Sequence, residues 1–465
     1  MPERDAAGPD DACATDDAPL GSDGNALRLL PGGDETFAAL LADIERATVR
    51  VWLECYIFVP DGAGRKFLVA LRDAAARGCD VILLVDRFGS HALRERDVEP
   101  LCNAGGHAYW FNPFFGLREN AKKVTPFGIH RDHRKIMVID DDVAYFGGRN
   151  VSMAWAGGGS GGGGLVGSGG GSGIVGSSGA KEGEEFYDVM VRAEGPAARD
   201  FAAVFLETLD DTTDLRRDLF PAARGSGDAR VEVLQLDLRE KEGELDHAIC
   251  DLIANASGTL LFCTPYFIPP RPIHDALLDA ARRGVDVRIL TAGKCDVPWV
   301  MWAGRRLYPR FLAAGARIYE HNCDYLHAKF YVADGQTSII GSYNADRWGQ
   351  RFNQEDAGRI ASARLAGELA RCFEDGITDE VTPATVGAWA WYLVFFYRVM
   401  YALSHLIAPD ASQKRRVPDR QIPEVAAAAA DRTTAEGDGE EAADGEAEEG
   451  DAVSTEGRPP ERTRA

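Results

Sequence analysis

The sequence predicts an α/β protein built from two similar halves. In the first half, a strand-like apolar run at 49–59 is followed by a helix-like stretch and by a buried-strand pattern at 79–86. The second half repeats this order, with strand-like runs at 259–268 and 285–292. Strands that alternate with helices form βαβ units in mixed or parallel sheets. We therefore expect a duplicated mixed sheet flanked by helices.

Short motifs repeat together with these elements. The sequence Arg-Gly-x-Asp-Val occurs at 77–81 and again at 283–287, an offset of 206 (283 − 77). An eight-residue pattern, His-x-Lys followed by four residues and Asp, occurs at 133–140 and at 327–334. Because the motifs keep the same order in both halves, we interpret the chain as a duplicated domain in which each copy contributes one His-x-Lys motif.

Each His-x-Lys motif lies in an apolar stretch that predicts a strand. Side chains alternate between the two faces of a strand, so His133 and Lys135 share one face while Ile136 points into the core. The same alternation places His327 and Lys329 on one face in the second half. Each copy is therefore expected to present an imidazole beside an ammonium group.

A glycine-containing turn follows each motif at the same distance. The sequence GGRN ends at Asn150 and GSYN ends at Asn344, in both cases 17 residues after the histidine (150 − 133 and 344 − 327). Glycine permits a tight turn and a close approach of the backbone. The asparagine amides, the hydroxyl of Ser342 and backbone N–H groups could then donate hydrogen bonds to an anion.

These groups suit chemistry on a phosphodiester. Lysines neutralise the non-bridging oxygens, one imidazole attacks phosphorus and the other protonates the leaving oxygen. The lysines already supply positive charge and no carboxylate cluster of the two-metal kind occurs, so we predict no metal and no cofactor. One His-x-Lys pair alone is more often a surface pair than a site, but two copies with identical spacing favour a functional site.

With these motifs the chain resembles the phospholipase D superfamily, whose signature is HxKxxxxD followed by GGxN or GSxN. The resemblance covers about residues 26–379. Within the superfamily, several stretches are most similar to those of bacterial cardiolipin synthases. They are LECYIFVPDGAGRKF, TPYFIPP, RRGVDVRIL, FLAAGARIYEH and GSYNADRWGQRFNQE.

The resemblance implies two similar domains with the active site between them and a phosphohistidine intermediate. It implies that His133 is the nucleophile and His327 the general acid, an order that the residues alone do not fix. It also implies that Asp140 and Asp334 orient the site and support its hydrogen bonds. The alternative for each aspartate is a turn cap.

Further positions follow from the same resemblance. Asn150, Ser342 and Asn344 would bind phosphate, and Glu355, in the sequence FNQE, matches a family carboxylate that contacts the site. A solvated charge is the alternative for Glu355. Relatives carry an acidic residue near Asp188, but we assign no catalytic role to Asp188.

Composition shifts along the chain predict its organisation. A Gly-rich insertion at 157–179 interrupts the first domain and is either unstructured or a mobile lid that touches lipid. The expected segments are a disordered acidic N-terminus at 1–25, a first phospholipase D-like domain at 26–218, a second at 228–380, an apolar interfacial helix at 386–408 and a disordered acidic tail at 409–465.

Charge and cysteine content narrow the class of protein. The formal net charge is -22 and no long Lys/Arg run occurs, so no nucleic-acid partner is expected. The nine cysteines form no CxxC pair, which argues against a structural zinc site or a disulfide framework. The N-terminus lacks the pattern of a signal peptide, which favours the cytoplasmic face of the cell membrane.

The apolar segment at 386–408 predicts contact with a membrane. Its 23 residues (408 − 386 + 1) are long enough to span a bilayer, but Arg398 and His405 make a span costly. Its tryptophans and tyrosines are typical of a membrane interface. We therefore expect a peripheral, interfacial helix, the alternative being a helix packed on the second domain.

The function predicted from these observations is phosphatidyl transfer between phospholipids, with phosphatidylglycerol as substrate and cardiolipin as product. Hydrolysis of phospholipid to phosphatidic acid by the same chemistry is the main alternative. A phosphodiesterase-type nuclease and a lipid-binding scaffold with an inactive site are weaker alternatives. The sequence does not set the oligomeric state.

Overall fold

The computed structural model describes residues 20–112, 130–157, 185–237 and 243–408. All of them belong to one compact unit, Met1–Arg415. Most of the Gly-rich insertion and the whole C-terminal tail lie outside the described residues. The expected N-terminal boundary was wrong, because strand β1 (Gly21–Leu30) begins five residues before residue 26 and pairs with β10 (Ala229–Leu236).

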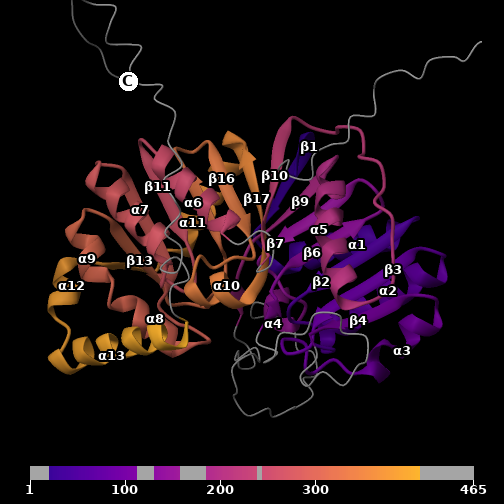
Figure 1. The fold of residues 1–465 in the computed structure, drawn as a ribbon, viewed down its shortest axis with the longest axis horizontal. Coiled ribbons are helices and arrows are strands. Elements are labelled where there is room, and N and C mark those ends of the chain that lie inside the picture. Colours follow the sequence, from indigo (N-terminus) through magenta and orange to yellow (C-terminus); the bar gives the residue numbers. More distant parts are fainter. Residues whose placement is uncertain (1–19, 113–129, 158–184, 238–242, 409–465) are drawn as a thin grey trace, which may run out of the picture. The chain divides into compact units, whose positions relative to one another are not determined.

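The expected duplicated mixed sheet is present, and it runs continuously through both halves (Figure 1). The strand order is β18-β13-β12-β11-β15-β16-β17-β10-β1-β9-β7-β6-β2-β3-β4. The remaining strands of the first half are β2 (Arg50–Cys55), β3 (Asp80–Asp86), β4 (His107–Phe111), β6 (Lys135–Ile139), β7 (Val143–Gly147) and β9 (Met190–Glu194).

The second half repeats this arrangement. Its strands are β11 (Thr259–Cys263), β12 (Asp286–Ala292), β13 (Arg317–His321), β15 (Phe330–Ala333), β16 (Thr337–Gly341), β17 (Asn353–Ala361) and β18 (Asp379–Val381). In each half two parallel pairings follow from βαβ units, β2 with β3 and β3 with β4 in the first, and β11 with β12 and β12 with β13 in the second. In each half an antiparallel hairpin carries the His-x-Lys motif.

Helices cover both faces of the sheet. The first half carries α1 (Gly33–Arg46), α2 (Gly62–Ala76), α3 (Glu95–Asn103), α4 (Met153–Ala156) and α5 (Ala197–Thr212). The second carries α6 (Glu244–Asn255), α7 (Arg271–Arg282), α8 (Pro298–Arg305), α9 (Tyr308–Ala313), α10 (Arg347–Phe352), α11 (Ala363–Gly376), α12 (Pro383–Gly387) and α13 (Trp391–Ile407).

Apolar packing explains this layering. Helices α5 and α11 bury their apolar faces in a central core that contains residues of both halves, among them Phe201, Phe205 and Phe373. The opposite faces of the sheet are covered separately, by α1 and α2 in the first half and by α6 and α7 in the second. Both halves therefore share one interior core, which fixes them against each other.

The apolar segment at 386–408 does not form one helix, which corrects its expected bounds. Helix α12 ends at Gly387, and α13 begins at Trp391 after a break at Ala390. One face of α13 packs on α8, where Tyr397 and Ser404 are buried. None of the helices in the described part of the chain combines the length and apolarity needed to cross a membrane.

The junction between the halves depends on one glycine. A Cβ at Gly358, in β17, would lie 2.7 Å from Cε2 of Phe146, in β7 of the other half. We predict that Gly358→Ala lowers the free energy of unfolding by about 1–3 kcal/mol, because the ring in the packed core has little room to move. Chemical denaturation would measure this change.

The matched control is Gly367→Ala. Gly367 lies inside α11, and a Cβ there meets nothing within 4 Å. Alanine favours the helix, so stability should stay equal or rise by about 0.5–1 kcal/mol. Equal losses in both variants would contradict the assigned packing at the junction.

Candidate active site

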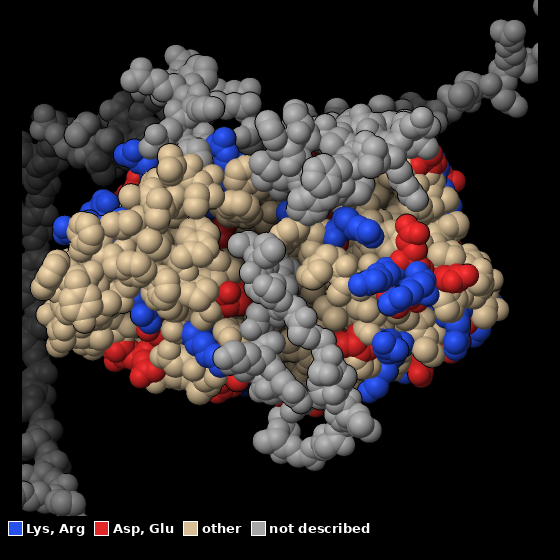
Figure 2. Space-filling model, turned by 90° about the horizontal axis from the view of Figure 1, so that it is seen from below, with Lys and Arg blue, Asp and Glu red and all other residues tan. Residues whose placement is uncertain are grey.

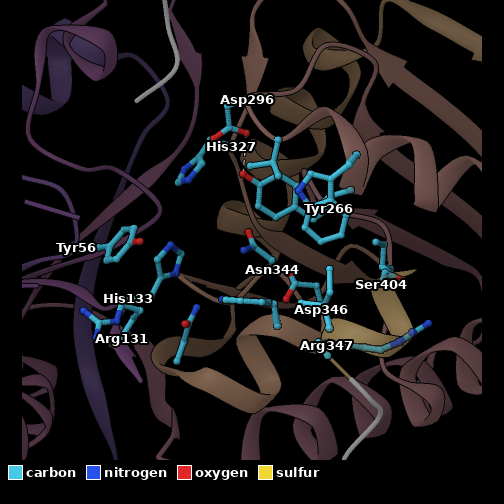
Figure 3. A pocket seen from close by; sticks show the side chains of 18 of the residues that line it. Tyr56, Arg131, His133, Tyr266, Asp296, His327, Asn344, Asp346, Arg347 and Ser404 are labelled. Atoms are coloured by element: carbon cyan, nitrogen blue, oxygen red, sulfur yellow. Dashed lines mark hydrogen bonds between the residues drawn. The ribbon is translucent and has the colours of Figure 1, made fainter. Parts of the chain in front are cut away.

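A cavity of about 590 Å³ contains both motif histidines. His133 comes from the first half and His327 from the second, and both side chains are drawn in Figure 3. The site thus lies between the halves, as the fold class predicts. The strands begin later than expected, β6 at Lys135 and β15 at Phe330, so each histidine lies in the turn before its strand.

Short parallel strand pairs hold each histidine against the backbone of the other half. Strand β5 (Arg131–Asp132) pairs with the start of β17, and the N–H of His133 donates to the carbonyl of Gln354 at 3.0 Å. In the same way, β14 (Tyr325–Leu326) pairs with β8 (Phe186–Tyr187), and the N–H of His327 donates to the carbonyl of Tyr187 at 2.8 Å. The two halves position each other's histidines.

The side chains form two crossed histidine–carboxylate pairs. His133 Nδ1 lies 2.9 Å from Oε2 of Glu355, a residue of the second half. His327 Nδ1 lies 2.7 Å from Oδ2 of Asp188, a residue of the first half. Both carboxylates are fully or almost fully buried. Because each Nδ1 is engaged, Nε2 is the ring nitrogen left to act on a molecule in the pocket.

Asp188 is the site residue that the sequence reasoning missed. It occupies the position equivalent to Glu355, because each carboxylate follows two residues that pair with the two residues before a histidine. The insertion hides this equivalence, since Asn344 and Glu355 are 11 residues apart and Asn150 and Asp188 are 38 (355 − 344 and 188 − 150). Matching the residues on the far side of the insertion would have revealed it.

The difference between GGRN and GSYN follows from these carboxylates. A Cβ at Gly148 would overlap the carboxylate of Asp188. At the equivalent position, Ser342 Oγ donates to Glu355 Oε2 at 2.6 Å. Ser342 does not line the cavity. Its hydroxyl orients Glu355, and the expectation that Ser342 binds phosphate stays a prediction.

The two motif asparagines both line the cavity. Asn150 Oδ1 accepts from the N–H of Ile57 at 3.0 Å, and its Nδ2 is buried without a partner among the described residues. Asn344 is also buried, and its Oδ1 has no partner in the described structure. Unpaired buried amide groups are costly, so their position favours a polar ligand in this cavity.

Both lysines lie against the turns that carry the histidines. Lys135 Nζ donates to the carbonyl of His133, and Lys329 Nζ donates to the carbonyl of His327. Each lysine side chain is only 1% exposed. Burial lowers the pKa of Lys329 to about 7 and also lowers the pKa of Lys135. Lys329 thus titrates near neutral pH.

Burial also suppresses the charge on both imidazoles. Together with the charges of Lys135 and Lys329, it holds the pKa of His133 well below its ordinary value. Burial and Lys329 lower the pKa of His327 to about 4. Aromatic rings contribute to this burial, with Tyr56 at 4.8 Å from the ring centre of His133. Both imidazoles are therefore neutral at pH 7.

The two partner carboxylates differ in charge. Burial raises the pKa of Glu355 to about 7, although Lys135 opposes the shift. Burial also acts to raise the pKa of Asp188, but His327 and Lys329 outweigh it and hold that pKa below its ordinary value. Asp188 is therefore ionised at neutral pH while Glu355 is partly protonated.

The last residue of each motif lies away from the cavity. Asp140 accepts hydrogen bonds from the N–H groups of Thr48, Val49 and Arg50 at 2.8–3.2 Å. It lies at the opposite end of β6 from Lys135, roughly 17 Å away at about 3.3 Å per residue. The expectation that it orients the site is corrected, because it caps the turn that leads into β2, at the end of the strands far from the cavity.

Asp334 has the same structural role in the second half. Its carboxylate accepts from the N–H groups of Ser257, Gly258 and Thr259 at 2.7–2.9 Å. Burial acts to raise its pKa, but these donors keep the pKa lowered. Both aspartates have positive φ angles, 48° for Asp140 and 51° for Asp334, a backbone conformation that aspartate tolerates in tight turns.

The chemistry of the site requires only these side chains. Within the described ranges, no group of three or more His, Cys, Asp or Glu residues is placed to hold a metal ion. Two neutral imidazoles and two amides line one cavity, and two buried lysines lie against the backbone of the histidines. This combination can bind an oxyanion, attack it with one imidazole and move a proton with the other.

The fold and this site define a member of the phospholipase D superfamily. The family described as "Cardiolipin synthase, PLD-like domain" matches residues 40–155 and 249–376, which together make up more than half of the chain. The chain belongs to this family.

Curated relatives agree with this assignment. The chain is 28% identical over 396 residues to "Cardiolipin synthase" of Staphylococcus aureus (strain Mu50), covering 82% of this chain and 74% of that protein. It is also 28% identical over 361 residues to "Major cardiolipin synthase ClsA" of Bacillus subtilis (strain 168), covering 76% and 69%.

A solved structure shares the fold. The phosphatidylserine synthase of Haemophilus influenzae Rd KW20 superposes with a TM-score of 0.60 at 15% sequence identity, covering 83% of this chain and 95% of that chain. At this identity the likeness concerns the fold alone.

The buried lysine generates a pH-dependent prediction. Lys329 is charged below a pKa of about 7 and neutral above it. Glu355 gains negative charge over the same range, because its pKa is also about 7. Both changes weaken anion binding as the pH rises, so affinity for diethyl phosphate should fall about tenfold between roughly pH 6 and pH 8.

Intrinsic tryptophan fluorescence would report this binding, since Trp155 lines the cavity. Lys329→Met should bind weakly at low pH and show a flatter dependence. Lys66→Met, at an exposed position on α2, should behave as the wild type. Affinity that rises with pH in the wild type would contradict the assignment.

Proposed function

We propose that the protein is a phosphatidyltransferase of the cardiolipin synthase type. It transfers a phosphatidyl group from one phospholipid to a hydroxyl of phosphatidylglycerol through a phosphohistidine. The observation that carries the proposal is the pair of crossed histidine–carboxylate contacts across one cavity. Membership of the cardiolipin synthase family supports the same substrate class.

In the first step, His133 Nε2 attacks phosphorus and the bond from phosphorus to the headgroup oxygen breaks. His327 gives its proton to that oxygen, so the headgroup leaves as an alcohol. The bound phosphodiester anion raises the pKa of the neighbouring imidazole, which allows His327 to carry this proton. Lys135, Lys329 and the amide of Asn150 stabilise the negative charge on the non-bridging oxygens.

In the second step, the hydroxyl of the acceptor lipid gives its proton to His327 and its oxygen attacks phosphorus. The bond from phosphorus to His133 then breaks, which returns both histidines to their first state. Atoms and protons balance over the two steps, and the products are cardiolipin and the released headgroup alcohol. The phosphorus bond energy is conserved in the intermediate, so no cofactor is required.

The partner carboxylates explain this division of roles. Asp188 is ionised, so it stabilises the imidazolium form of His327 that a general acid needs. Glu355 has a raised pKa and supports the imidazolium form of His133 less strongly. His133 therefore stays neutral more readily than His327, as a nucleophile requires. Each carboxylate also fixes the orientation of its imidazole.

Apolar residues around the cavity fit a lipid substrate and transfer rather than hydrolysis. The wall provided by α8 and α10 includes Trp299, Val300 and Trp348. An apolar wall accommodates acyl chains and disfavours water near the phosphohistidine. The last turn of α13 continues this wall with Ile407 and Ala408.

Helix α13 also provides a surface for the membrane. Its outer face exposes an apolar stripe at helical spacing, including Trp391 (81% exposed), Phe395 (62%) and Leu406 (79%). Figure 2 shows few charged side chains on the described surface at the left, where α13 and α8 lie, whereas charged side chains gather on the first half. We propose that this face rests in the lipid interface, beside the cavity.

The first test uses purified protein and phosphatidylglycerol vesicles. Mass spectrometry should find cardiolipin and glycerol with the wild type and no turnover with His133→Ala, a loss of about a thousandfold or more because the nucleophile is gone. The matched control is His247→Ala, at an exposed position on α6, which should retain activity. Phosphatidic acid as the sole product would show a hydrolase instead.

A second test concerns the membrane surface. The double variant Phe395→Asp, Leu406→Asp should bind phosphatidylglycerol vesicles about tenfold more weakly or worse, because two charges replace buried apolar contacts. Vesicle sedimentation measures this binding, and activity on short-chain lipid monomers should persist. Val69→Asp, at a 47% exposed position on α2, is the control. If the double variant sediments with vesicles as the wild type does, the proposal that α13 binds the membrane is wrong.

A further inference from the structure

The two sides of the cavity differ in their polar groups. In the view of Figure 3, Tyr56 and Arg131 are drawn beside His133 and the carboxylate of Asp296 is drawn beside His327, and all of these residues line the cavity. Asp296 also acts electrostatically on Lys329, which contacts His327. Asp296 follows β12 in the loop that leads into α8, and it lines the cavity. A carboxylate is an unfavourable neighbour for a phosphate anion. Its position requires another explanation than phosphate binding.

A tyrosine fixes this carboxylate. The hydroxyl of Tyr266 donates to Oδ1 of Asp296 at 2.7 Å, and Tyr266 lines the same cavity. Among the contacts of the described residues, the hydrogen bonds to Asp296 reach Oδ1 and leave Oδ2 as an acceptor. A carboxylate held by a neighbouring hydroxyl is a preorganised acceptor for the hydroxyl groups of a ligand.

The pair has no counterpart on the side of His133. Asp140 caps a turn that begins at Thr48, and Asp334 caps the corresponding turn that begins at Ser257. The two turns are 209 residues apart (257 − 48), so Ile57 in the first half corresponds to Tyr266 in the second. The offset of 206 in the next strand makes Ser90 equivalent to Asp296.

These equivalent residues differ in chemistry and in position. Ile57 lines the cavity but offers an apolar side chain, and Ser90 is fully buried against the backbone of Phe58 and Tyr56. The hydroxyl–carboxylate pair thus distinguishes the half of the site that contains His327 from the half that contains His133.

We propose that Tyr266 and Asp296 form a subsite for the free hydroxyl groups of a polyol headgroup. The inference rests on the proposed function, in which His327 exchanges a proton with the reacting oxygen of that headgroup. When a glycerol oxygen faces His327, the adjacent glycerol hydroxyl donates to Asp296. The subsite selects glycerol over simple alcohols and over water, because only a polyol satisfies the carboxylate while its neighbouring oxygen reacts.

The subsite serves both steps of transfer. In the first step it holds the glycerol of the donor as the phosphorus–oxygen bond breaks. In the second it holds the glycerol of the acceptor phosphatidylglycerol, whose second hydroxyl attacks phosphorus. A simple alcohol reacts at the same phosphohistidine without using the subsite. The preference between the two kinds of acceptor therefore tests the subsite independently of the transfer reaction itself.

The experiment offers two alcohols to the full-length enzyme on phosphatidylglycerol vesicles. Equal concentrations of deuterated glycerol and 1-propanol compete, and mass spectrometry measures the ratio of labelled phosphatidylglycerol to phosphatidylpropanol. The wild type should favour glycerol. Asp296→Asn should lower the ratio about tenfold, because both products arise from the same phosphohistidine and only glycerol uses the subsite in the second step. Tyr266→Phe should lower the ratio less.

Asp275→Asn is the matched control, since Asp275 lies on α7 of the same half, pairs with His274 and does not line the cavity. It should leave the ratio unchanged, and thermal unfolding verifies that each variant is folded. If Asp296→Asn does not fold, the Tyr266→Phe ratio decides. An unchanged ratio in folded variants would overturn the subsite alone. A wild type without any lipid product would overturn the proposed function and the subsite with it.

Discussion

The crossed contacts between each histidine and a carboxylate of the other half are the constraint on which the site depends. Glu355 orients His133 and Asp188 orients His327, so neither half contains a complete imidazole site. The same segments pair as short parallel strands. This pairing keeps the backbone of each histidine within hydrogen-bonding distance of the other half. The shared core between α5 and α11 is the larger structure that keeps these contacts in register.

The duplicated halves are nevertheless chemically unequal. Four charged side chains are buried behind His133, three from the first half and one from the second, and among them Arg134 donates to Thr208 at 2.9 Å and to Gln235 at 3.1 Å. The four residues are Glu54, Asp132, Arg134 and Asp356. Their counterparts around His327 are uncharged, namely Cys263, Leu326, Ala328 and Val189. Burial raises the pKa of Asp132 to about 7, so a carboxylate behind His133 changes charge near neutral pH, whereas beside His327 it is the ammonium of Lys329, with a pKa of about 7, that does so.

The sequence predicts most of the fold because the buried strands are short apolar runs and the duplication repeats them. The His-x-Lys pairs and the asparagines could be predicted from the sequence as well, since their spacing is identical in both copies. Three features depend on tertiary contacts that spacing does not encode. Asp188 is separated from its motif by the insertion, Ser342 turns toward Glu355, and Asp140 caps a turn at the far end of its strand. Glu355, expected from the family resemblance, does contact His133.

Transfer and hydrolysis share the phosphohistidine and differ in which hydroxyl reaches it. The cavity combines an apolar wall, which disfavours water, with the carboxylate of Asp296, which Tyr266 anchors and which in the proposed subsite replaces the water bound to a polyol. The wall continues into the last turn of α13, whose opposite face is apolar and exposed. In the proposed function, a lipid passes from the surface of α13 into the cavity along apolar side chains, and only its headgroup meets polar groups. Because the histidines react with any hydroxyl in the same way, we expect the residues around His327 to decide which acceptor is used.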